Sequence, residues 1–291
     1  MELIEEARAK INLTLNVIGR LDNGYHALHS LVGFANIGDR IQFSPGSKIE
    51  IEELGPFAKD LKGPNVLKKV FEILQKKYPH LLLGRVSLQK NLPVASGIGG
   101  GSADAAALLR AIKKTNTQLQ DQISWEEIAR EVGADVPVCM ENKAVWMSGI
   151  GHTLHLLKKP LPLLHLLLIN PMVPVPIDKT TQVFKMLKAK RIKEEEAEAH
   201  LSFPEFLNKK ALFDFIKRKQ NDLLPPARKL IPEISIILEV LQKCEGLEIA
   251  SLSGAGPTCF GIFSNSRMVE TAQQLISEDH PSWWMRPASL V

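Results

Sequence analysis

A chain of 291 residues with 45% hydrophobic residues is long enough for two modest domains or one large domain with substantial cores. Its net charge of +4 is mild, and its basic residues are scattered with few aromatic residues between them. This pattern argues against a nucleic-acid-binding surface and is compatible with an anionic small substrate. The three cysteines, Cys139, Cys244 and Cys259, stand far apart, which predicts a reducing compartment and no structural zinc site.

Neither the N-terminus nor the most apolar segment of the chain indicates a membrane protein. The N-terminus is acidic and lacks the apolar core of a signal peptide. The most apolar run, residues 161–169, is too short to cross a bilayer and is typical of a buried strand. We therefore expect a cytoplasmic protein that does not contact membranes.

The first part of the chain predicts mainly strands. Residues 7–18 alternate apolar and polar side chains, as a strand does, and Asp22-Asn23-Gly24 marks a turn. Residues 40–43 and 48–51 are typical of a hairpin, and 85–89 of another half-buried strand. Between them, Asn65 precedes an amphipathic helical pattern and is a candidate N-cap.

The rest of the chain mixes both kinds of element. Ser124 opens a capping box before a helix that Gly133 ends. The remaining predictions are strands at 143–148, around Leu252 and around Phe260, a stiff connector at 171–176, and helices at 178–189, 204–219 and 226–243. The charged run at 185–200 indicates a solvated helix face or a mobile excursion. There is no internal repeat and no strict β-α-β alternation, so the pattern favours an α+β fold over a doubly wound sheet.

The most informative stretch is the first glycine loop, residues 93–102, in which four of the five positions 97–101 are glycine. With so few Cβ atoms, its N–H groups can curl around a bulky anion. The Ala/Leu-rich segment behind it forms helices readily, and a helix start directs unpaired N–H groups and the positive end of its dipole at one point. The loop therefore predicts a phosphate site.

Other interpretations of this loop fit less well. A Walker A loop needs a lysine before the serine, and Gly101-Ser102 has none. A dinucleotide fingerprint starting at Gly97 or Gly99 needs a third glycine where Ser102 or Asp104 stands. A flexible loop without a ligand is the remaining alternative, although the strand pattern at 85–89 suggests a rigid strand–loop–helix unit.

Three further clusters carry reactive side chains. Lys10 and Asn12 lie on one face of the first predicted strand. The alternative interpretation is that this face is an ordinary solvent-exposed one. Asp135 lies in Gly-Ala-Asp-Val-Pro, where a simple helix cap is the alternative. Residues 251–261 form a second glycine loop that could also be only a tight turn. Taken together, two anion-binding loops, a lysine and an aspartate are what phosphoryl transfer to an alcohol needs.

Residues 7–13, 93–107 and 251–261 resemble, in order and spacing, the three motifs of the GHMP small-molecule kinases. The resemblance covers most of the chain except about 185–220. It implies a two-lobe α+β fold, with an N-terminal ATP-binding domain at 1–152 that is like ribosomal protein S5 domain 2. A ferredoxin-like C-terminal domain at 153–291 would follow.

The resemblance also implies roles for individual residues. Asp135 would be the general base for the substrate hydroxyl, and Lys10 would hold it ionised and orient the hydroxyl. Asn65 matches a position near the adenine, with its N-cap role as the competing explanation. ATP, with Mg²⁺ bridging its phosphates, would lie on the first glycine loop, whose expected nucleotide-binding residues are Pro93, Val94, Ala95, Ser96, Gly97, Ile98, Gly99, Gly100, Gly101 and Ser102. We assign no metal-ligating side chain.

The element Gly24-Tyr25-His26 narrows the resemblance to the family branch that phosphorylates the C2 hydroxyl of 4-diphosphocytidyl-2-C-methyl-D-erythritol in non-mevalonate isoprenoid biosynthesis. Tyr25 and His26 could recognise cytosine by stacking and hydrogen bonds. Phe184 is a candidate for the other side of the stack or for a core residue, and Asn12 and Thr180 are weaker candidates for substrate contacts.

The chain departs from the family pattern at four places. Arg8 stands where proline is usual, Asp22 where the turn usually has proline, Ala103 where a second serine is typical, and Ser251 where arginine is common. Only Ser102 can therefore offer a hydroxyl to phosphate or metal at the helix start. None of the four is the expected base, so the resemblance still implies a kinase.

Two alternatives of different classes stay open. The chain could phosphorylate another alcohol of the family, such as homoserine, mevalonate or a sugar. It could also be a non-catalytic nucleotide-sensing protein of the same fold, although both Lys10 and Asp135 are present. We expect a monomer or a weak homodimer that does not bind nucleic acid.

Overall fold

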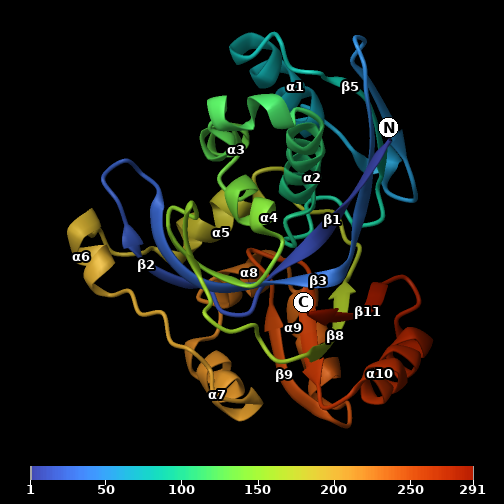
Figure 1. Ribbon diagram of the computed structural model, residues 1–291. Helices are drawn as coiled ribbons and strands as arrows, with labels where there is room; N and C mark the ends of the chain where they lie inside the picture. The colour runs from blue at the N-terminus through green and yellow to red at the C-terminus, as the bar shows by residue number, and fades with distance from the viewer. Residues whose placement is uncertain (1, 291) are drawn as a thin grey trace. The chain divides into compact units, whose positions relative to one another are not determined.

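The computed structural model describes residues 2–290, and the chain forms two compact units that draw on interleaved segments (Figure 1). The first unit comprises the chain up to Lys10 together with Ile37–Val94 and Gly99–Asn142, and the second comprises Ile11–Asn36, Ala95–Ile98 and everything from Lys143 onward. The division into consecutive domains at 1–152 and 153–291 stays a prediction, since compact units and evolutionary domains need not share a boundary.

The first unit holds the start of β1, the second half of β3, and a group of helices that lie together in Figure 1. Its elements are β1 (Leu3–Asn12), β3 (His26–Pro45), β4 (Glu50–Leu54), the 3-10 helix η1 (Ala58–Asp60), α1 (Val66–Lys77), β5 (Gly84–Gln89), α2 (Gly100–Thr115), the 3-10 helix η2 (Thr117–Gln122), α3 (Trp125–Val132) and α4 (Val136–Glu141).

The sheet of the first unit corrects one prediction. The expected hairpin of residues 40–43 and 48–51 does not form, because β5 lies between the two strands. β5 pairs antiparallel with β3, through Arg40 opposite Gln89, and parallel with β4, through Glu50 opposite Arg85. The turn at 46–49 therefore leads to a strand that is two positions away in the sheet, and it does not close the predicted hairpin.

Helix α2 is the central helix of the first unit and packs against α1, α3 and α4. Its alanines are buried, which allows neighbouring helices to approach closely. Both predicted N-caps form: Asn65 accepts hydrogen bonds from the backbone of Leu67 and Lys68, and Ser124 accepts one from Glu127. Gly133 ends α3 as predicted.

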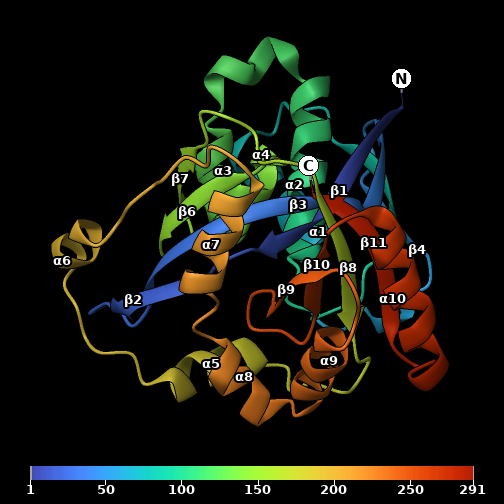
Figure 2. The same cartoon turned by 90° about the horizontal axis from the view of Figure 1, so that it is seen from below.

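The second unit holds the remaining strands and most of the later helices (Figure 2). Besides the first half of β3, its elements are β2 (Asn16–Arg20), β6 (Val145–Gly149), β7 (Thr153–Leu156), β8 (Leu164–Asn170), α5 (Lys179–Leu187), α6 (Glu194–Ala199), α7 (Lys209–Lys219), α8 (Leu224–Leu230), α9 (Glu233–Gln242), β9 (Leu247–Leu252), β10 (Cys259–Phe263), α10 (Ser266–Asp279) and β11 (Trp284–Leu290).

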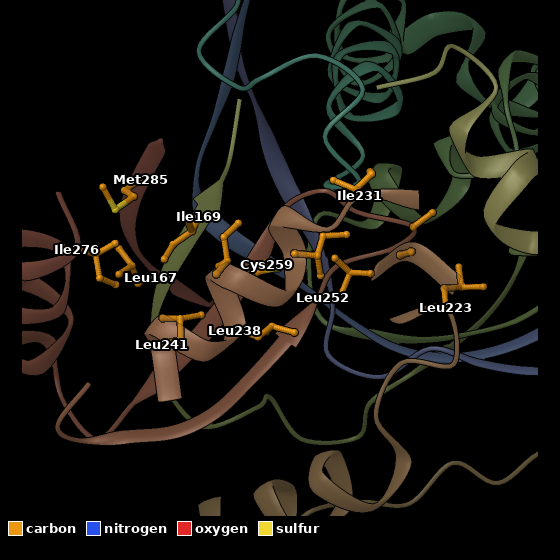
Figure 3. Packing of buried hydrophobic residues seen from close by; sticks show 14 of the residues in the cluster. Leu167, Ile169, Leu223, Ile231, Leu238, Leu241, Leu252, Cys259, Ile276 and Met285 are labelled. Carbon is orange, nitrogen blue, oxygen red and sulfur yellow. The ribbon is translucent and has the colours of Figure 1, made fainter. Parts of the chain in front are cut away.

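Four antiparallel strands run in the order β11-β8-β10-β9, and α9 and α10 pack on them. The core of this unit combines Leu167 and Ile169 of β8 with Leu238 and Leu241 of α9, and with Met285 of β11 (Figure 3). β8 is an almost continuous apolar run with buried side chains, as the sequence predicts for residues 161–169. Among residues 2–290, no helix is long and apolar enough to cross a membrane.

Several predicted elements of this unit have different boundaries. The strand expected over residues 7–18 is interrupted between Asn12 and Asn16, and the single helix expected at 226–243 is two helices. Pro232 breaks that helix, because the residue before a proline is pushed out of the helical conformation. The charged run at 185–200 contains α6, in which only Ala197 is buried, so the predicted solvated helix face is confirmed. Neither α10 nor β11 is predicted from the sequence pattern.

Candidate active site

The first glycine loop ends at the start of α2. The helix and its N-cap Gly99 belong to the first unit. Gly99 is the N-cap, with a positive φ of 69° and no side chain to cap the helix. The first N–H groups of any helix lack an acceptor within the helix, and its dipole is positive there. A Cβ placed on Gly101 would meet no other atom within 4 Å, so open space adjoins these N–H groups. The helix start therefore fits a phosphate group.

Lys10 of β1 lies against this helix start and pairs with Asp135. A Cβ on Gly99 would approach the Cβ of Lys10 to 3.0 Å, which, with the positive φ, explains a glycine at this position. Lys10 Nζ lies 2.9 Å from Asp135 Oδ2, and the lysine side chain is 5% exposed while the aspartate is 40% exposed. The pair thus combines a buried ammonium with a carboxylate that a substrate can reach.

Asp135 occupies the N-cap position of α4, but its side chain makes no capping hydrogen bond. The simple helix-cap interpretation of this aspartate is therefore wrong: its carboxylate points to Lys10 and not to the backbone of its own helix. Nearby, burial raises the pKa of the Cys139 thiol to about 12, so this cysteine is not a nucleophile at neutral pH.

A second ionic cluster lies beneath the same helix start, and the sequence analysis missed it. Lys90, directly after β5, contacts Asp39 of β3 at 2.5 Å and Asp104 of α2 at 2.7 Å, and all three side chains are buried. Asp39 also accepts backbone hydrogen bonds from Asn91 and Leu92. The cluster therefore ties the segment that enters the first glycine loop to the helix that leaves it. The sequence does carry one signal of this cluster: Asp104 is a single charged residue within an alanine-rich helical segment.

In the second unit, residues 95–98 of the first glycine loop pack against the second glycine loop. The backbone of Thr258 donates to the carbonyl of Ser96, and the hydroxyl of Ser253 donates to the carbonyl of Gly97. A Cβ on Gly97, where φ is +81°, would lie 2.6 Å from the Gly256 carbonyl oxygen. Gly97 is thus required for the packing of the two loops, whereas the sequence pattern predicts a role for it in phosphate binding.

Asn12 is fully buried in the second unit, beside the second glycine loop. Its backbone N–H donates to the Ser253 hydroxyl and its side-chain amide donates to the Ser30 hydroxyl. Its side-chain oxygen is buried with no hydrogen-bond partner in the described structure. A buried acceptor without a partner is uncommon in folded proteins, so this oxygen marks a place where a further donor is expected.

His26 and Phe184, both candidates for the cytosine site, contact each other directly. Their rings stack on each other with centroids 4.8 Å apart, which leaves no room for a base between them, and Phe184 also packs against the core of the second unit, as its alternative role predicts. Burial, with a smaller effect from the charge of Arg20, lowers the pKa of His26, which keeps the ring neutral at pH 7. Tyr25 is 60% exposed, and Thr180 is exposed near the start of α5. A neutral ring can both donate and accept a hydrogen bond.

The remaining predicted residues divide by environment. Pro93, Ser96 and Ile98 are buried, whereas Val94 and Ala95 are exposed. The side-chain oxygen of Asn65 caps α1, and its side-chain nitrogen donates a hydrogen bond to Glu53. Any contact of Asn65 with adenine would be made in addition to the cap and to this hydrogen bond. The sequence analysis also missed Lys179, a buried lysine of α5 that contacts both glycine loops.

Comparison with known protein families gives matches to both halves of the chain. The GHMP kinases N terminal domain matches residues 65–143, and the GHMP kinases C terminal domain matches residues 205–280. Among curated proteins, the chain is 39% identical to 4-diphosphocytidyl-2-C-methyl-D-erythritol kinase of Rhodopseudomonas palustris strain CGA009, with 100% of this chain and 98% of the relative covered. It is 41% identical to the enzyme of the same name from Cereibacter sphaeroides, with 98% of each covered.

Solved structures agree with the sequence relatives. A crystal structure of 4-(cytidine 5'-diphospho)-2C-methyl-D-erythritol kinase superposes with a TM-score of 0.73 at 26% identity, covering 100% of this chain and 99% of that one. Homoserine kinase from Cytophaga hutchinsonii shares the fold with a TM-score of 0.70 at 18% identity. The expected two-domain α+β fold is thereby confirmed. The chain therefore belongs to the GHMP kinase family of small-molecule kinases.

Proposed function

We propose that this kinase transfers the γ-phosphoryl group of ATP to the C2 hydroxyl of 4-diphosphocytidyl-2-C-methyl-D-erythritol, giving the 2-phosphate and ADP in isoprenoid precursor biosynthesis. Relatives of that name match the chain over its whole length at 39% and 41% identity. The observation that carries the chemistry is the ion pair of Lys10 and Asp135 beside the open start of α2.

Asp135 is the proposed general base. As the C2 oxygen attacks the γ-phosphorus and the bond to the β-phosphate oxygen breaks, the hydroxyl proton passes to the Asp135 carboxylate. Lys10 holds that carboxylate in place at 2.9 Å and stabilises the charge that develops on the attacking oxygen. A positioned base contributes roughly 10²–10⁴-fold in rate, or about 3–5.5 kcal/mol of the barrier.

The N–H groups at the start of α2 are the proposed clamp for the triphosphate. The open space at Gly101 fits a phosphate, and the Ser102 hydroxyl is the one side chain of the helix start that can bond it. Mg²⁺ supplies charge neutralisation between phosphate oxygens in such transfers. The described residues contain no group of three His, Cys, Asp or Glu side chains arranged to hold a metal ion. Phosphate oxygens and water would therefore supply most of its ligands, with Ser102 as the candidate from the protein.

His26 and Phe184 are the proposed cytosine site, together with Tyr25. The stacked pair offers an aromatic surface, and the neutral imidazole offers one donor and one acceptor for the polar edge of the base. The buried oxygen of Asn12 and the exposed Thr180 hydroxyl are candidates for contacts to other polar groups of the substrate.

An assay of ADP release with a panel of alcohols tests this function. We expect turnover with 4-diphosphocytidyl-2-C-methyl-D-erythritol and none with homoserine, mevalonate or galactose. Turnover of one of the other alcohols alone would assign a different substrate within the family. Binding of ATP without turnover on any alcohol would instead support a nucleotide-sensing protein. The cytoplasmic location and the monomeric or weakly dimeric state expected from the sequence stay predictions.

A further inference from the structure

Lys179 is a buried lysine that no step of the proposed mechanism uses. It is the first residue of α5 and is 4% exposed. No carboxylate lies in ion-pair contact with it anywhere in residues 2–290. Burying an ammonium without a carboxylate is costly, so a fold selected for stability alone would favour an apolar side chain here.

The ammonium of Lys179 contacts both glycine loops. Its Nζ donates a hydrogen bond of 2.9 Å to the carbonyl of Ala95 in the first loop, and another to the carbonyl of Gly256 in the second loop. All three residues belong to the second unit. Because an ammonium carries three donors and no acceptor, it can bridge two carbonyls that could not otherwise approach each other.

One of the two carbonyls that Lys179 bridges belongs to a residue with an unfavourable backbone conformation. Ala95 has a positive φ of 54°, which is unfavourable for a residue with a Cβ, and Gly256 has a φ of +76°. The loops are also joined by hydrogen bonds at Ser96 and Gly97, the two residues that follow Ala95. Lys179 adds two further hydrogen bonds to this junction, at Ala95 and at Gly256.

We propose that Lys179 is a positioning residue for the nucleotide, whose ammonium clamps the two glycine loops together so that the first loop is held ready for ATP. This inference rests on the proposed role of the first glycine loop in nucleotide binding. It does not depend on which alcohol the enzyme phosphorylates. Lys179 itself touches loop carbonyls and is not assigned to the reacting atoms.

The clamp makes the affinity for the nucleotide depend on pH, which an apolar or permanently charged side chain at this position would not do. Burial lowers the pKa of Lys179 to about 8. No charged group contributes to this lowering of the pKa. Asp178, the N-cap of the same helix, accepts a hydrogen bond from Gln182, and the loop segments 95–98 and 253–258 carry no ionisable side chain. Arg228 and Lys229 of α8, which packs against α5, make no contribution either. Above pH 8 the neutral amine has one donor fewer and a lone pair facing carbonyl oxygens, so the clamp loosens.

The test measures the Kd of ADP, in the presence of Mg²⁺, for the wild type and for Lys179→Met at pH 7 and pH 9. We expect Lys179→Met to weaken ADP binding at least tenfold at pH 7, and to show a smaller change between the two pH values than the wild type does. Lys185→Met, which alters an exposed lysine of the same helix, should bind ADP as the wild type does. Equal affinities of Lys179→Met and wild type at pH 7, or parallel pH profiles, would overturn the proposal.

A second variant covers the case in which Lys179→Met does not fold. Lys179→Arg keeps its charge at pH 9, and we expect its ADP affinity to change less than twofold between pH 7 and pH 9. If neither variant folds, the wild type decides alone: an ADP affinity that is constant between pH 7 and pH 9 would reject the clamp. Because ADP binding is measured without an alcohol, a failure of the proposed substrate would leave this result standing.

Discussion

Lys90 and Asp104 form an ion pair of 2.7 Å in which both side chains are only 2% exposed. The pair joins the end of β5 to the first turns of α2, so it sets the direction of the helix whose N–H groups we assign to phosphate. Burial raises the pKa of Asp104 well above its usual range. The charge of Lys90 acts to lower this pKa, and the charge of Asp39 acts to raise it further. Burial alone would lower the pKa of Lys90, but Asp104 and Asp39 outweigh it and the pKa is raised.

Removing the ammonium of this cluster should be costly. Lys90→Met leaves two buried carboxyl groups without a cation, and breaking a buried pair in this way costs about 3–5 kcal/mol. We expect urea unfolding to show a loss of this size. Lys113→Met, on the exposed side of α2, should change the free energy of unfolding by no more than about 0.5 kcal/mol. A loss below about 1 kcal/mol for Lys90→Met would contradict a structural role for the cluster.

Asp135→Asn tests the general base. The amide keeps the size of the side chain but cannot accept a proton, so kcat should fall at least about a hundredfold, while the Kd of ADP stays within about twofold. Steady-state kinetics and calorimetry measure the two quantities. Asp121→Asn, an exposed aspartate elsewhere in the same unit, is the matched control and should keep full activity. A decrease of less than tenfold in a folded Asp135→Asn protein would remove this residue from the role.

Gly101→Ala separates phosphate binding from helix stability. A Cβ at this position meets no protein atom, and alanine favours a helix over glycine by about 0.5–1 kcal/mol. The variant should therefore be as stable as the wild type or slightly more stable. Its KM for ATP should nevertheless rise at least about tenfold, because the methyl group occupies the space that we assign to a phosphate.

The matched control for this change is Gly46→Ala. Gly46 lies in the turn before β4 and also has open space at its Cβ position, so its replacement should leave the KM for ATP unchanged. If Gly101→Ala bound ATP normally, the open space would not be a phosphate site.

The His26–Phe184 stack should determine recognition of the base. His26→Ala and Phe184→Ala should each raise the KM for the cytidyl substrate much more than the KM for ATP, since each removes half of one aromatic surface. His80→Ala, an exposed histidine of the first unit, serves as the control. Equal increases in both KM values would argue against a cytosine site at this stack.

Stability should respond to pH through Lys179. The pKa of this lysine is about 8 in the folded protein against 10.5 ordinarily, so between these values the unfolded chain binds a proton that the folded protein has released. Folding stability then rises with pH in this window. Relative to Lys179→Met, the wild type should gain up to about 3 kcal/mol between pH 8 and pH 10.5, at 1.36 kcal/mol per pKa unit. Urea unfolding of both proteins at pH 7.5 and pH 10 measures the difference, and an unchanged difference would contradict a depressed pKa.

Local signals identified most single elements correctly. The caps at Asn65 and Ser124, the strand at 85–89 and the helix after the first glycine loop follow from neighbouring residues alone, because capping and periodicity act over a few positions. The hairpin predicted at 40–51 failed because strand pairing is a long-range choice. Nothing within those residues indicates that β5 would insert between the two strands.

From local pattern, the sequence predicted a phosphate site at the glycine loop before a helix, and a lysine and an aspartate for phosphoryl transfer, and it showed the family resemblance that the comparisons bear out. Only the tertiary structure decided which groups meet. It gave the geometry of the pair of Lys10 and Asp135 that the resemblance implies, assigned Gly97 to loop packing, and revealed Lys90 and Lys179. The physical reason is that these contacts join residues far apart in the chain. Their formation depends on how β1, β5 and α5 pack, and local propensity carries no information about that packing.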